Sequence, residues 1–142
     1  MKGAEITGDK ELARALARLG KGVQKEAGKV VDATALEVRG EIVKGYNKGP
    51  ATGRVYQRGN ISHRASAPGE APMTDTGRLA SSVVYENTGT LSAEVHTKVN
   101  YGAWLEYGTR DIAPRPLWLP TAKKAAPKFV RRMAAFLKRK MR

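Results

Sequence analysis

The sequence predicts an α+β protein with one domain, residues 1–142. Three observations lead to this fold class: long amphipathic patterns lie at both ends, a β-hairpin pattern lies between them, and globular domains commonly hold ~100–150 residues. The chain has no cysteine. We therefore expect neither a disulfide framework nor a thiolate metal site.

The first predicted element is a long helix over residues 9–46. Its leucines, valines and alanines recur at spacings of three and four residues, which is typical of a helix with one buried face. Asp9 suits the N-cap, and Gly45 ends the pattern. Gly20 and Gly22 each weaken a helix by ~1 kcal/mol relative to alanine, so the helix could break there.

Residues 47–74 are predicted to form an extended loop or arm, because glycine and proline recur and little periodicity remains. A loop of this length inside a small domain is uncommon and is usually functional or disordered. Val55, Tyr56 and Ile61 could form a short strand within it.

A short helix over residues 75–82 and a β-hairpin over residues 83–99 are predicted next. Asp75 or Thr76 could cap the helix. The hairpin turns at residues 88–90 and alternates apolar with polar side chains. Its predicted buried face carries Leu91, Ala93, Val95, Thr97 and Val99.

The C-terminal part is predicted to contain a short helix over residues 101–107, an extended segment through Pro114, Pro116 and Pro120, and a last helix within residues 117–142. One face of that helix is apolar, with Ala122, Ala126, Phe129, Met133 and Phe136. Another face forms a basic stripe, with Lys124, Lys128, Arg131, Lys138 and Arg142.

The formal net charge is +13, and residues 112–142 contribute most of it, with ten basic and no acidic side chains. Such a surface favours an acidic partner: nucleic acid, an anionic membrane surface or an acidic protein face. The alternative is a solvated face that only keeps the protein in solution.

No catalytic, cofactor-binding or metal-binding constellation is found in the sequence. His63 and His96 lie far apart, so a zinc site is not expected. Glu86 and Glu94 are expected to face each other across the hairpin, without the cleft that a glycosidase needs. An apolar leader and an apolar run of spanning length are both missing, so neither a signal peptide nor a membrane helix is expected.

Two segments together resemble a known family. The first is residues 67–79, which include Asp75, Thr76, Gly77, Arg78 and Leu79. The second is residues 99–118, with Tyr101, Trp104, Glu106, Tyr107, Gly108 and Thr109 followed by Pro114, Arg115 and Pro116. Their order and spacing resemble the minor tail, tail-completion (head-to-tail joining) proteins of long-tailed double-stranded DNA bacteriophages.

The resemblance implies a structural role without enzymatic activity or a cofactor. It implies a small antiparallel sheet packed against the first and last helices. It also implies a ring, expected to be sixfold, at the neck between the head connector and the tail tube. The implied partners are the chain itself, other neck proteins and the tail tube or terminator proteins. Non-specific contact with packaged DNA is a further expectation, and a membrane is not. The implied location is the virion, after synthesis in the host cytoplasm.

The motif residues also have a physical interpretation. Gly77 is expected to allow a close backbone approach, Leu79 to enter the core and Gly108 to adopt a left-handed conformation. Glu106 is expected to pair with one of three arginines, Arg78, Arg110 or Arg115. Trp104 is expected in the core, whereas Tyr107 and Trp118 could either fill the core or anchor a neighbouring subunit.

The candidate interface therefore has two parts. The arm, which is expected to reach a neighbouring subunit or another neck protein, contributes Arg54, Tyr56, Arg58 and Arg64. The rest comprises Tyr107 and Trp118 with Lys124, Lys128 and Arg131, and the basic stripe is expected to meet an acidic face on a neighbouring subunit, another neck protein or DNA. The main alternative is a small basic nucleic-acid-binding protein. A membrane-surface protein is a weaker alternative.

Overall fold

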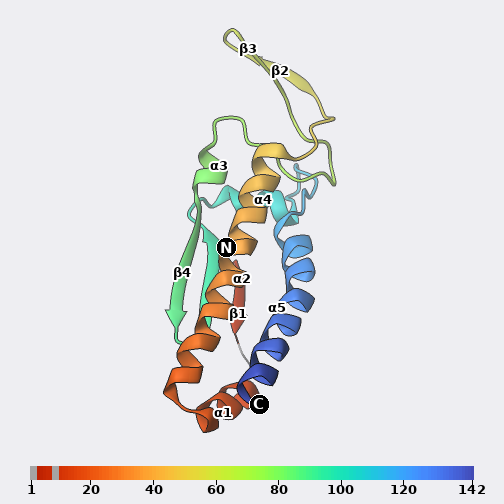
Figure 1. The fold of residues 1–142 in the computed structure, drawn as a ribbon. Helices are drawn as coiled ribbons and strands as arrows, with labels where there is room; N and C mark the ends of the chain where they lie inside the picture. The colour runs from red at the N-terminus through yellow and green to blue at the C-terminus, as the bar shows by residue number, and fades with distance from the viewer. Residues whose placement is uncertain (1–2, 8–9) are drawn as a thin grey trace.

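The computed structural model describes residues 3–7 and 10–142. A three-stranded antiparallel sheet of order β1-β5-β4 covers one side of the long helix α2, and the last helix, α5, runs along another side of α2 (Figure 1). The α+β class predicted from the sequence is confirmed. The elements, in chain order, are β1 (Ala4–Thr7), α1 (Lys10–Leu19), α2 (Lys21–Lys48), β2 (Val55–Arg58), β3 (Ile61–Arg64), α3 (Arg78–Ser81), β4 (Val83–Gly89), β5 (Ser92–Thr97), α4 (Tyr101–Tyr107) and α5 (Trp118–Lys140).

The predicted first helix is two helices, because the chain changes direction at Gly20. Gly20 has φ 97°, in the left-handed region that glycine tolerates and other residues rarely adopt. The predicted cap, Asp9, lies outside the described residues. The helical break near residues 20–22 is therefore observed at its first glycine.

The second helix continues to Lys48, so the prediction that Gly45 ends it is wrong. A Cβ at Gly45 would lie 2.6 Å from Cδ1 of Leu117, which shows that this glycine permits close packing against the segment before α5. Gly28 has a similar role, because its Cβ would lie 2.3 Å from the carbonyl oxygen of Thr90. Gly28 and Gly45 are therefore packing positions inside α2.

The predicted hairpin forms from β4 and β5, with Val83 paired to Thr97 and Glu86 to Glu94, but it turns at residues 90–91 and not at residues 88–90. The face of β5 that carries Ala93, Val95 and Thr97 is buried against α2. The third strand, β1, pairs with β5 on its other side and was not predicted. A four-residue edge strand is too short to give a clear alternating pattern in sequence.

The core lies between the sheet, α2 and α5. At its upper end the Trp118 indole nitrogen donates a hydrogen bond to the Tyr46 hydroxyl, at 2.6 Å, and both side chains are buried. Burial raises the pKa of Tyr46 to about 12, so the phenol stays protonated and can accept this bond. Of the predicted apolar face of α5, Met133 and Phe136 are buried, whereas Ala126 is exposed.

Prolines fit into α5 better than expected. Pro120 was assigned to an extended segment, but it lies in the first helical turn, where its missing N–H has no partner within the helix in any case. Pro127 lies inside the helix, where a proline removes one intrahelical hydrogen bond.

Ion pairs join α2 to α5 at the molecular surface. Glu37 accepts from Arg132 Nη1 at 2.6 Å and from Lys128 Nζ at 3.1 Å. Farther along, Lys140 Nζ lies 2.7 Å from Glu26. The hydrogen bonds from Arg132 and Lys128 lower the pKa of Glu37 below its ordinary value. Part of the basic charge of α5 is therefore compensated within the chain.

The lowered pKa of Glu37 predicts a pH-dependent contribution to stability. Its stabilisation is fully present above the unfolded-state value, 4.5, and is lost as the pH falls through the lower folded-state pKa. The melting temperature of Glu37→Gln should therefore be lower than that of the wild type at pH 7, and the difference should shrink to zero in acid. Glu41→Gln, at an exposed position without a described partner, should show no such trend. A difference for Glu37→Gln that is constant across this range would contradict the assignment.

Candidate interaction surfaces

The Glu106 carboxylate organises the junction between α4 and α5. Its Oε2 accepts from the backbone N–H of Leu117 at 2.8 Å and of Trp118 at 3.0 Å, and its Oε1 accepts from Leu119 at 2.9 Å. The next residue, Pro120, has no N–H. The first N–H groups of a helix lack acceptors within the helix. The Glu106 carboxylate therefore supplies an acceptor for every such N–H group in the first turn of α5.

The pairing predicted for Glu106 is therefore wrong. The residue is 5% exposed, and no described arginine forms an ion pair with it. Arg115 instead donates its backbone N–H to Leu105 and its Nη2 to the carbonyl of Ser66, which ties this segment to the base of the arm. Arg78 and Arg110 are exposed. A buried carboxylate at a helix N-terminus is stabilised by the helix dipole and by N–H donors, so an arginine is not required.

The two tryptophans lie in different environments, and only that of Trp104 contradicts the prediction. Trp104 is 54% exposed on α4, so its predicted core position is wrong. Trp118, a candidate interface anchor, is buried. Tyr107 is 69% exposed, which leaves it available for a partner, and Tyr101 is partly buried beside the core. Alternation along a short helix did not separate these faces, because α4 has only two turns.

The turns at Gly77 and Gly108 also differ in detail from the prediction. Gly77, the N-cap of α3, has φ 78°, and no atom would contact its Cβ within 4 Å, so it supplies a positive φ rather than a close approach. The Thr74 hydroxyl accepts from Gly77 N–H at 3.0 Å, in place of the predicted Asp75 or Thr76 cap. Leu79 is buried as expected. Gly108 has the expected positive φ, 77°, but an extended ψ of 172°.

The turn after Gly108 is held by Thr109. Its backbone N–H donates to the carbonyl of Ile112 at 2.8 Å, and its hydroxyl accepts from the N–H groups of Asp111 and Ile112. Pro114 then packs close to Gly108, where a Cβ would lie 2.9 Å from the proline Cδ. The turn, together with Pro116, delivers the chain to the start of α5.

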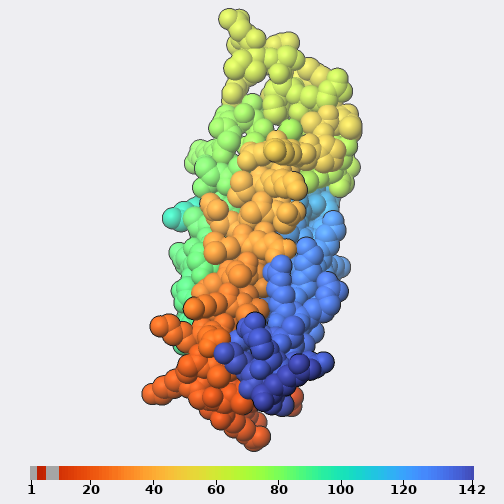
Figure 2. All heavy atoms as spheres, in the orientation of Figure 1, coloured from red at the N-terminus to blue at the C-terminus, as the bar shows by residue number. Residues whose placement is uncertain are grey.

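The arm is a β-hairpin that projects from the end of the body (Figure 1). Strands β2 and β3 pair from Val55 with Arg64 to Arg58 with Ile61. The apolar side chains on it are exposed: Val55 by 44%, Tyr56 by 42% and Ile61 by 59%. Figure 2 shows the arm as a narrow extension beyond the packed body. An isolated two-stranded hairpin is only marginally stable in water. A hairpin with exposed apolar side chains is therefore suited to packing against a partner.

The base of the arm is nevertheless well connected. Glu70 accepts from the N–H groups of Thr52 and Ala67 and from the Thr52 hydroxyl, and these bonds lower its pKa. Asp75 pairs with Arg58 at 3.1 Å and lies 3.5 Å from His63 Nδ1. Of the candidate arm residues, Arg58 and Tyr56 are therefore held by contacts within the chain, Tyr56 through a ring contact with His63. Arg54 and Arg64 are exposed.

The basic stripe of α5 divides into two groups. Lys128 is paired with Glu37, so it is not an open position for a partner. Lys124 and Arg131 are exposed and have no ion pair within the described residues. An open groove of about 260 Å³ between α2 and α5 lies beside this stripe and is lined by lysines and glutamates, among them Glu41, Lys44 and Lys124.

The described part of the chain offers neither a metal site nor a membrane-spanning helix. Residues 3–7 and 10–142 contain no cluster of three histidine, aspartate or glutamate side chains that could hold a metal ion. No described helix has the length and hydropathy required to cross a bilayer.

Removing the Glu106 charge should destabilise the protein. In Glu106→Gln, fewer N–H groups of α5 find an acceptor, and the amide donor faces another donor. We expect the free energy of unfolding to fall by about 2–3 kcal/mol, measured by urea denaturation. The matched exposed variant Glu41→Gln should change it by less than about 0.5 kcal/mol. Equal stability of the two variants would refute the capping role.

Comparison with known proteins points to one family. The model of the family described as "Bacteriophage HK97-gp10, putative tail-component" matches residues 10–108. The match spans α1 to α4, including the arm, and ends at Gly108, before the turn that leads to α5. No curated protein and no solved structure is significantly similar to the chain.

Proposed function

Because the match covers most of its length, the chain belongs to the HK97-gp10-like family of bacteriophage tail components, and we propose that it is a tail-completion subunit. In this proposal it assembles into a ring at the neck, between the head connector and the tail tube. The subunit contacts further copies of itself, other neck proteins and the tail tube or terminator proteins. Its location is the virion, reached from the host cytoplasm.

The observation that carries the proposal is the projecting arm. It is folded at its base and paired along its strands, yet its apolar side chains remain exposed. Large exposed apolar residues on an ordered element mark an interaction surface. In a ring, such an arm can lie on a neighbouring subunit or on the next ring of the neck.

The surface outside the arm also suits a structural subunit. The strongest polar constellation, at Glu106, is saturated by backbone N–H groups and therefore serves the fold. Two exposed aromatic side chains, Trp104 and Tyr107, lie on α4. Exposed tryptophan and tyrosine commonly anchor protein partners. The proposed role requires shape and contacts and includes no chemical transformation.

Deleting the arm tests this function. The two ends of the arm touch: Gly53 N–H donates to the Ala65 carbonyl at 2.8 Å, and a Cβ at Gly53 would lie 2.6 Å from the Ser66 oxygen. Residues 54–64 can therefore be replaced by a short Gly-Ser linker that leaves Gly53 and Ala65 in place. In phage carrying this deletion, heads and tails should accumulate unjoined and the infectious titre should be lost.

A control variant, Asn60→Ser at the exposed tip, should join heads and tails normally. Circular dichroism and thermal melting of the purified deletion protein establish that its body is folded. Normal joining by a folded deletion protein would show that the arm is dispensable and would remove the main support for the proposal.

Proteolysis provides a second prediction about the arm. Trypsin should cleave the isolated protein at Arg54, Arg58 or Arg64, which are exposed, before it cleaves the body. In assembled tails these positions should be protected, because a partner covers them. Mass spectrometry of the fragments over time measures both rates. Equally slow cleavage in the two states would contradict the proposed contact.

A further inference from the structure

An acidic row crosses the outer face of the sheet. Glu94 on β5 is paired in register with Glu5 on β1 and with Glu86 on β4. Its neighbours along β5, Ala93 and Val95, are buried against the body, so the alternation of a strand directs the glutamate outward. We call Glu5, Glu94 and Glu86 the acidic row.

The acidic row is uncompensated within the described part of the chain. None of its glutamates forms an ion pair with a residue in ranges 3–7 and 10–142, whereas Glu26 and Glu37 on α2 both do. Like charges directly opposite each other across strands destabilise a sheet. We therefore expect a cationic surface to cover the three glutamates of the acidic row, which lie in register.

A matching cationic row runs along α5. Lys124, Arg131 and Lys138 are exposed and follow one another at seven-residue spacing, so they lie within ~40° of each other around the helix. Met133, nine residues after Lys124, lies ~180° away and is buried. The row therefore points away from the core. Unlike Lys128, Arg132 and Lys140, its members have no ion pair among the described residues.

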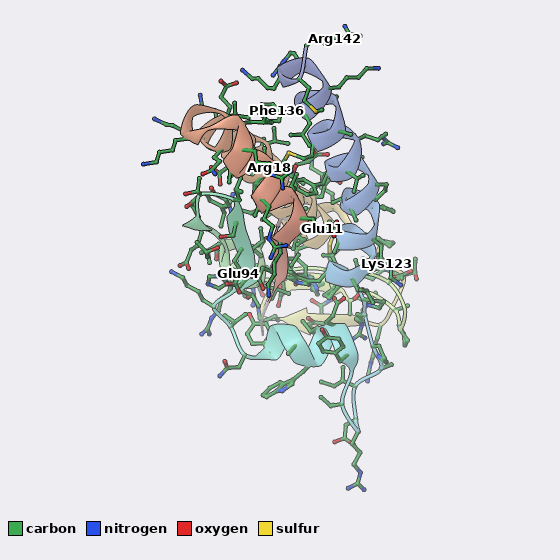
Figure 3. The ribbon with its side chains drawn as sticks, turned by 90° about the horizontal axis from the view of Figure 1, so that it is seen from below. Glu11, Arg18, Glu94, Lys123, Phe136 and Arg142 are labelled. Carbon is green, nitrogen blue, oxygen red and sulfur yellow. The ribbon has the colours of Figure 1, made fainter. Side chains whose placement is uncertain are left out.

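The two rows lie on opposite flanks of the molecule. Figure 3 shows Glu94 on the side of the sheet and Lys123, which begins the basic part of α5, on the other side. Glu5, on the edge strand β1, lines a hollow with Ala122 and Ala125 of α5, whereas Glu94 and Glu86 lie on the two strands beyond β1. The two rows are complementary in charge and not in spacing: neighbouring glutamates are ~5 Å apart across the strands, whereas successive cations are ~10 Å apart along the helix.

We propose that the acidic row of one subunit binds the cationic row of a second copy of this chain. This inference rests on the proposed ring and names the surfaces that build it. Two different surfaces on opposite flanks make a head-to-tail contact, which closes into a ring when the rotation between copies allows it. Phosphate groups would match only the cationic row, whereas a second copy accounts for both rows.

The first experiment captures the contact in the wild-type protein. A carbodiimide joins a carboxylate to an amine that it touches. In oligomer bands we expect links from the acidic row to Lys124 or Lys138, identified by mass spectrometry of the peptides. Because Glu86 and Glu94 lie on the strands beyond β1, a link from either of them joins two copies, and only these links count as support. The pairs Glu37 with Lys128 and Glu26 with Lys140 provide internal positive controls. Oligomers linked only elsewhere, or a protein that remains monomeric at low salt, would overturn the proposal.

The second experiment reverses the charges of each row. Glu86→Lys with Glu94→Lys, or Lys124→Glu with Arg131→Glu, should abolish the oligomer in mass photometry. A mixture of the two variants should restore it, because each reversed row then finds a complementary row. Glu11→Lys with Asp111→Lys, and Lys21→Glu with Lys25→Glu, change the charge equally at exposed positions off the rows and should assemble as wild type. Circular dichroism verifies that each variant is folded.

The outcomes separate this inference from the proposed function. If wild type and both reversed variants assemble equally well, the row contact is refuted and the ring stands. If the cation reversal abolishes DNA binding while the acid reversal leaves assembly intact, the cationic row serves nucleic acid and the contact is again refuted. If phage lacking the protein still join heads to tails, the proposed function fails together with the inference.

Discussion

The buried carboxylate of Glu106 is the contact on which the arrangement of the C-terminal half depends. It accepts hydrogen bonds from the free N–H groups of the first turn of α5 and so determines where that helix begins. When the helix begins there, the Trp118 indole donates a hydrogen bond to the Tyr46 hydroxyl. The Leu117 side chain then packs against Gly45, which has no side chain in the way. An unpaired carboxylate in this position would be strongly unfavourable. The cap, the turn and the helix–helix contact therefore form together.

Helix α2 is the common support of the other elements. The sheet packs on one side of it and α5 on another (Figure 1), and two of its glycines allow backbone or side chains to approach more closely than any larger residue would. Its surface glutamates take up part of the charge of α5. Lys124, Arg131 and Lys138 on α5 stay exposed and without an ion pair among the described residues, so they remain open to a partner.

Membership of a family of bacteriophage tail components gives these surfaces a context. A subunit of a large assembly needs surfaces that stay unpaired in the monomer and are complementary between copies. An in-register row of glutamates and a straight row of cations have this property, since each is repulsive alone and salt-sensitive when paired. The projecting hairpin adds an apolar contact of a different kind. The proposed ring combines both.

Local patterns in the chain were sufficient for the α+β class, the break at Gly20, the hairpin with its buried face and the extra segment that became the arm. Periodicity reports which residues are buried along one element, glycine and proline report where an element is interrupted, and these features depend only on such local signals. The role of Glu106, the buried position of Trp118 with Trp104 exposed, the strand β1, and the continuation of α2 through Gly45 were decided by tertiary structure. Each depends on a partner distant in sequence: N–H groups eleven to thirteen residues away, a tyrosine on α2, the edge of β5, or a leucine before α5. No pattern within one element encodes such a partner, because the contact exists only after the elements have packed.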